Sequence, residues 1–144
     1  MKEKVLFYNL DENVKQAILT ILKQLDVETK EIYQEDASQQ MGYLLDLSGY
    51  KRNNNKSDNH LVEPFLFFAY FTMEQLDIVL EVFKQANIPY IPYKAMLTND
   101  NVVYTFEQLY TNVENEYLQL TNKEKSNWQI CKISLLLKKR HNGG

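Results

Sequence analysis

The residues best suited to chemistry lie in one short stretch, KAMLTNDNVVYT, between positions 94 and 105. A lysine follows an apolar run there, and hydroxyl and amide side chains come just before an expected helix start. The candidate site residues are Lys94, Thr98, Asn101, Tyr104 and Thr105. A cation beside a helix N-terminus is suited to anions, because the first N–H groups of a helix have no partner inside it. The functional hypothesis is a site for a small anionic ligand, or for a protein partner, at one end of a sheet.

Lys94 also has an ordinary structural interpretation. A lysine on an edge strand can lay its stem along the sheet and extend its ammonium into water, where the charge discourages pairing with a foreign strand. From spacing alone, this structural interpretation is favoured over a ligand site.

Sequence motifs for other chemistry are missing. The chain has no GxGxxG, P-loop, GxSxG or HExxH pattern. Its two histidines are His60, in an asparagine-rich stretch, and His141, near the end, and neither has a partner ligand nearby in the sequence. Cys131, the single cysteine, lies on the apolar face of an expected helix, as a small buried residue would. We therefore nominate no catalytic residue, metal ligand or cofactor, and an enzyme is the less favoured class.

The elements that must position these residues follow from hydrophobic periodicity and capping patterns. Continuous apolar runs predict buried strands, and apolar residues at helical spacing behind a capping residue predict amphipathic helices. The stretch from 51 to 60 has no apolar residue and is expected to be a solvated, mobile loop. The expected strands are 5–10, 29–33, 65–71 and 90–97, and the expected helices begin at Asp11, Gln39, Thr72, Thr105 and Thr121.

An internal repeat relates the two halves of the body. A shift of 61 positions places Phe7 on Phe68 and Asp11 on Thr72, so that 4–33 and 65–97 both read strand–helix–strand. These units predict an α+β domain over 1–120 with a ferredoxin-like βαβ-βαβ plan, and a small parallel α/β sandwich is the alternative. The first and third strands, which are the most apolar, should be central. Charge in the second strand and Pro92 in the fourth are typical of edges.

The third strand is apolar at both alternating phases, whereas a sheet with one wet face alternates apolar with polar residues. Its second face should therefore be covered, either by the helices from Thr105 to Arg140 or by a second subunit in a homodimer. Exposed aromatics for stacking RNA bases are the competing interpretation. No basic residue lies beside these phenylalanines, and the body is acidic, so nucleic-acid binding is disfavoured.

Charge is divided unevenly along the chain. Residues 1–120 have ten basic and eighteen acidic side chains, a net charge of −8, while 121–144 have six basic and one acidic, a net charge of +5. The basic tail could fold onto its own body, reach a partner subunit or bind an anionic polymer. This gives the alternative function, a structural or protein-interaction module acting through the helix from Lys123 to Arg140. One cysteine and no apolar run long enough to cross a membrane indicate a cytoplasmic protein.

The segment from Glu63 to Tyr110 resembles a bacterial family of domains of unknown function, DUF3783. The similarity rests on QLD at 75–77, IPYKAMLT at 91–98, Asn101 and the Tyr104–Thr105 helix start, with MGYL at 41–44 and GY at 49–50 upstream. Asn99–Asp100 departs from the Pro-Thr that is common in the family, and Tyr104 from its tryptophan. The resemblance spans about the first 115 residues and implies no activity. It gives the candidate site equal weight with the structural interpretation, and the expected function is a non-catalytic ligand-binding or regulatory module.

Overall fold

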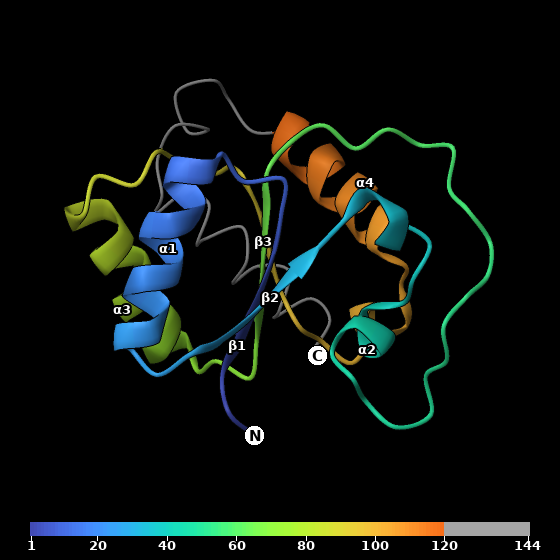
Figure 1. Ribbon diagram of the computed structural model, residues 1–144, viewed down its shortest axis with the longest axis horizontal. Coiled ribbons are helices and arrows are strands. Elements are labelled where there is room, and N and C mark those ends of the chain that lie inside the picture. The colour runs from blue at the N-terminus through green and yellow to red at the C-terminus, as the bar shows by residue number, and fades with distance from the viewer. Residues whose placement is uncertain (120–144) are drawn as a thin grey trace.

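The structure, a computed structural model, describes residues 1–119. Within that range, four strands form one open sheet in the order β2-β1-β3-β4 (Figure 1). The strands are β1 Lys4–Tyr8, β2 Glu28–Ile32, β3 Phe65–Ala69 and β4 Tyr93–Met96. β1 and β2 pair in parallel, as do β3 and β4, whereas β1 and β3 pair antiparallel. The two most apolar strands are therefore central and the other two are edges, as the sequence predicts.

The longer helices begin at the capping residues that the sequence indicates. The Asp11 carboxylate accepts a hydrogen bond from the backbone N–H of Asn13 at the start of α1 (Glu12–Gln24). Thr72 and Gln75 form a reciprocal capping box at α3 (Met73–Gln85). The other helical elements are η1 Gln34–Asp36, α2 Met41–Leu44, η2 Asn101–Val103 and α4 Phe106–Leu118. No helix in the described part of the chain is long and apolar enough for a membrane crossing.

The internal repeat is visible in the backbone. Leu6 lies opposite Phe67 across the β1–β3 ladder, and these two residues are equivalents at a shift of 61. Antiparallel pairing about that point relates the two βαβ units by an approximate two-fold axis through the sheet. The units also share left-handed backbone positions, with φ of 54° at Asn9 and 70° at Tyr70 after the first strands, and 58° at Asp26 and 59° at Asn87 after the helices.

Helices cover both faces of the sheet. Figure 1 shows α1 and α3 together on one side and α2 and α4 on the other. Alternate β3 side chains face opposite sides, and the Phe65 ring packs edge-on against Phe106 of α4, with centroids 5.3 Å apart. Phe65, Phe67 and Phe68 have no exposed surface. The predicted covering of the second face is confirmed for α4, whereas the part of that segment from 121 onward lies outside the described residues.

The topology departs from the predicted plan. The ferredoxin-like arrangement is not confirmed, because its split βαβ units place another strand between the two parallel ones. Here the strands of each unit are direct neighbours. A purely parallel sandwich is excluded by the antiparallel β1–β3 ladder. The fold is a mixed α/β domain with an open four-stranded sheet.

Two local predictions also change. β4 begins at Tyr93 rather than at position 90, because Pro92 offers no N–H to the ladder. The stretch from 51 to 60 contains no helix or strand, as expected, but it is tethered to the body. The Gln39 side chain accepts from the Asn53 N–H and donates to the Asn53 carbonyl, both at 2.7 Å, and the Ser38 hydroxyl donates to the Asn55 carbonyl at 2.5 Å.

Candidate ligand site

Two of the predicted site residues, Thr98 and Asn101, form a turn after β4. The backbone N–H of Thr98 donates to Asn101 Oδ1 at 2.8 Å, and the N–H of Asn101 donates to Thr98 Oγ1 at 3.0 Å. Asn101 is fully buried, and its Nδ2 donates to the Met96 carbonyl at 2.7 Å. Tyr104 follows and joins this turn to α2 through a hydrogen bond from the Met41 N–H to the Tyr104 carbonyl. The polar side-chain atoms of Thr98 and Asn101, which were expected to face a ligand, instead hold the turn together.

Thr105 is the N-cap of α4, as predicted. It forms a capping box with Gln108, in which the Gln108 N–H donates to Thr105 Oγ1 at 3.2 Å. The N–H groups of Phe106 and Glu107 donate to backbone carbonyls of the segment before α2, both at 2.9 Å. The groups that make a helix N-terminus attractive to an anion are therefore already used.

Lys94 lies on the other face of the sheet. Its neighbour Tyr93 packs against Tyr110 of α4, so alternation directs Lys94 toward the α3 side. The lysine is only 2% exposed, which contradicts the interpretation that its ammonium reaches water. Its Nζ donates to the Ile91 carbonyl and lies 4.7 Å from the centre of the Tyr90 ring. A carbonyl and an aromatic face partly compensate for burying this cation.

A pocket of about 320 Å³ opens at the carboxyl ends of β3 and β4. Ligands of α/β proteins are commonly bound beyond the carboxyl ends of parallel strands. Of the five predicted site residues, Thr98 alone is among the described lining residues of this pocket. The described lining residues are mostly apolar: Leu47, Phe68, Tyr70, Phe71, Met96, Leu97, Thr98, Asn99 and Val102.

Tyr70 is the feature of this pocket that the sequence analysis missed. Its hydroxyl is buried, and none of the described residues provides it with a hydrogen-bond partner. A tyrosine hydroxyl is neutral at physiological pH, and burial raises the pKa of the Tyr70 hydroxyl further above its ordinary value. The residue also has φ of 70°, which is uncommon for a bulky side chain. The internal repeat was the available signal for this backbone conformation, because Tyr70 is the equivalent of Asn9, which also has positive φ.

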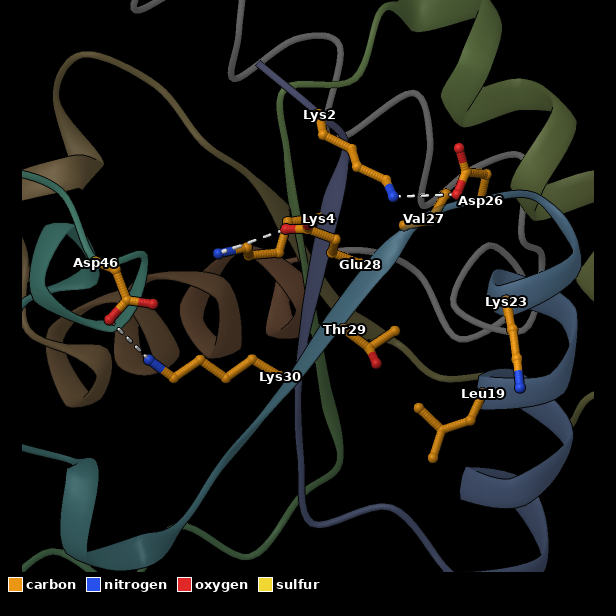
Figure 2. Close-up of a pocket in the computed structure, with 10 residues that line it drawn as sticks. All are labelled: Lys2, Lys4, Leu19, Lys23, Asp26, Val27, Glu28, Thr29, Lys30 and Asp46. Carbon is orange, nitrogen blue, oxygen red and sulfur yellow. Dashed lines mark hydrogen bonds and ion pairs between the residues drawn. The ribbon is translucent and has the colours of Figure 1, made fainter.

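A second hollow, of about 610 Å³, lies beside the β2 edge and contains four lysines. Figure 2 shows Lys2 directed at Asp26 and Lys30 directed at Asp46, with Nζ–Oδ1 distances of 3.0 Å and 3.4 Å. Lys30 Nζ also donates to the Leu44 carbonyl at 2.8 Å. Mixed charges in exposed pairs are ordinary for a protein surface and contribute little energy. We assign no ligand to this hollow.

The sequence predicts no metal ligand and gives no site role to His60, Cys131 or His141. Among residues 1–119, no group of three or more His, Cys, Asp or Glu side chains is arranged to hold a metal ion. His60 is exposed in the loop before β3. Cys131 and His141 lie outside the described residues.

The fold and the pocket define a two-unit βαβ domain with a mainly apolar cavity at the end of its second unit. Residues 64–119 match the family model described as "Domain of unknown function (DUF3783)". The match includes every described lining residue of the pocket except Leu47, while the MGYL and GY stretches upstream lie outside it. No curated protein and no solved structure matches the chain.

Proposed function

We propose that this protein is a non-catalytic binding module whose ligand occupies the pocket at the carboxyl ends of β3 and β4. One observation carries the proposal: the buried Tyr70 hydroxyl, which has no hydrogen-bond partner among the described residues. A buried polar group left without a partner costs about 1–3 kcal/mol. A ligand that accepts a hydrogen bond from this hydroxyl would recover that energy.

The lining favours an uncharged ligand with an apolar body. Its polar residues among those described are Tyr70, Thr98 and Asn99. The charged residue first suggested, Lys94, lies toward the opposite face of the sheet, and the leading N–H groups of α4 are occupied. The expectation of an anionic ligand therefore gives way to a neutral one. We assign no reaction to the pocket, because no carboxylate, imidazole or thiol is among these lining residues.

The test is a screen of small neutral amides, ketones and esters by ligand-observed NMR and thermal shift, using the full chain. Val102→Trp should fill the pocket and abolish binding. Val103→Trp is the matched control, because Val103 is 51% exposed, is not a lining residue and should leave binding unchanged. If no compound binds, or if both tryptophan variants bind equally well, the proposal fails.

A second candidate function rests on the charge division between the acidic body and the basic residues 121–144. In this proposal the basic segment docks on a partner protein, in the cytoplasm. Deleting residues 121–144 should then abolish an association that light scattering detects in the full chain. If the shortened chain has the same state of association as the full chain, this function is excluded and the pocket proposal is unaffected.

A further inference from the structure

The first βαβ unit already holds a chain segment across the carboxyl ends of its strands. Residues 59–62 cross that end just before β3 begins. The Tyr8 hydroxyl lies 2.5 Å from the Leu61 carbonyl, and Asn9 Nδ2 donates to the Val62 carbonyl at 2.8 Å. Gln34 Nε2 donates to the Asn59 carbonyl at 2.7 Å, and Leu61 is buried at 7% exposure. Side-chain donors bind the backbone carbonyls, and one aliphatic side chain anchors the segment.

Strand register shows which residues of the second unit are equivalent. Phe7 pairs with Glu31 in the first unit, and its equivalent Phe68 pairs with Met96 in the second. Counting three residues onward from Glu31 and from Met96 makes Asn99 the equivalent of Gln34. Both residues are carboxamides. Tyr70 is the equivalent of Asn9, and both follow their strand with positive φ.

The two ends differ in what fills them. Asn9 and Gln34 donate to the segment at 59–62. Their equivalents Tyr70 and Asn99 line the open pocket, where the buried Tyr70 hydroxyl has no described hydrogen-bond partner and Asn99 is exposed. Within residues 1–119, the second unit thus has polar side chains at the same two positions without a chain segment bound to them. The pocket volume, about 320 Å³, is at the small end for ligand sites and suits one or two side chains.

We propose that the pocket at the end of β3 and β4 binds an extended peptide segment with an aliphatic anchor residue. One backbone carbonyl of the peptide accepts a hydrogen bond from the Tyr70 hydroxyl and another accepts from the Asn99 amide, while the anchor side chain enters the apolar lining. The segment at 59–62 is the intramolecular counterpart of this ligand. The inference rests on the proposed binding function and names the class of ligand.

The experiment uses the full chain and two peptide probes. A displayed library of nine-residue peptides is selected on the protein, with a central residue that is either aliphatic or acidic. A fluorescein-labelled peptide with the sequence of residues 57–63, SDNHLVE, is titrated by fluorescence anisotropy. We expect the selection to enrich aliphatic centres and the labelled peptide to bind. Replacing the leucine of the labelled peptide by aspartate should abolish its binding.

Tyr70→Phe tests the hydrogen bond, because it removes the hydroxyl and keeps the ring. It should weaken peptide binding about three- to tenfold, the effect of one lost hydrogen bond. Tyr33→Phe is the matched control, because Tyr33 is 52% exposed at the end of the first unit and should leave affinity unchanged. If neutral small compounds bind and no peptide does, the peptide proposal is overturned while the binding function stands. If neither kind of probe binds, both proposals fail.

Discussion

Replacing Phe106 by alanine tests whether α4 covers the sheet as the structure indicates. Phe106 has no exposed surface and is the first residue of α4. Its ring lies 5.0 Å from that of Tyr8 and 5.3 Å from that of Phe65, so it contacts both central strands. Truncating a buried phenylalanine to alanine removes apolar burial and leaves a cavity, at a cost of about 3–5 kcal/mol. We expect the free energy of unfolding to fall by about 4 kcal/mol.

Urea unfolding followed by far-ultraviolet circular dichroism measures this loss. With a slope of about 2 kcal/mol per molar urea, the midpoint should fall by about 2 M. Leu118→Ala at the other end of α4 is the control, because Leu118 is 63% exposed and should change stability by less than about 0.5 kcal/mol. A loss below about 1 kcal/mol for Phe106→Ala, or equal losses for both variants, would refute the covering of the sheet by α4.

Three further changes probe the neighbourhood of the pocket and of α4. Asn101→Ala leaves the part-buried Thr98 N–H and the buried Met96 carbonyl without their Asn101 partners. Stability should therefore fall by about 2–3 kcal/mol in urea unfolding, and a loss no larger than that of the exposed Asn99→Ala would contradict this. Thr105→Ala removes the side-chain cap of α4 and should lower stability by about 1 kcal/mol in thermal unfolding. Thr105→Ser keeps a capping hydroxyl and should retain most of that stability. Equal stability of the two variants would count against the cap. Burial, assisted by the charge of Glu114, raises the pKa of Tyr93 to about 12, while an unfolded tyrosine titrates near 10. The stabilisation from Tyr93 is therefore complete below about pH 10 and lost as the pH rises toward 12. Unfolding experiments on Tyr93→Phe should show a smaller loss of stability between about pH 10 and 12 than the unsubstituted chain. The same dependence of stability on pH in both proteins would argue against a raised Tyr93 pKa.

Local patterns were sufficient to predict most elements and the centre of the sheet. The capping boxes at Thr72 and Thr105 form as their spacing indicates, because they depend on only four consecutive residues. Apolar residues at both phases of β3 correctly indicated burial on two faces. The order of the strands could not be predicted in the same way, since split and adjacent βαβ units have the same sequence of elements and differ only in long-range pairing.

The pocket was hidden from the sequence for two physical reasons. Thr98 and Asn101 are side chains that a ligand site would use, but such residues also form hydrogen bonds within their own turn, as they do here. Tyr70 gave no local signal, because tyrosine at the end of an apolar run usually continues the strand. Its positive φ becomes predictable only through the repeat, in which Asn9, a residue type that tolerates that conformation, is its equivalent.

Amide chemical-shift mapping tests the central claim, that the ligand site is the pocket at the end of β3 and β4. A nitrogen-15-labelled full chain is titrated with the SDNHLVE peptide and with the neutral compounds from the screen. We expect the largest shifts at Tyr70, Leu97 and Val102, and we expect no such shifts in Val102→Trp. Shifts confined to the lysine-containing hollow at β2, or no shifts at saturating concentrations of either probe, would contradict it.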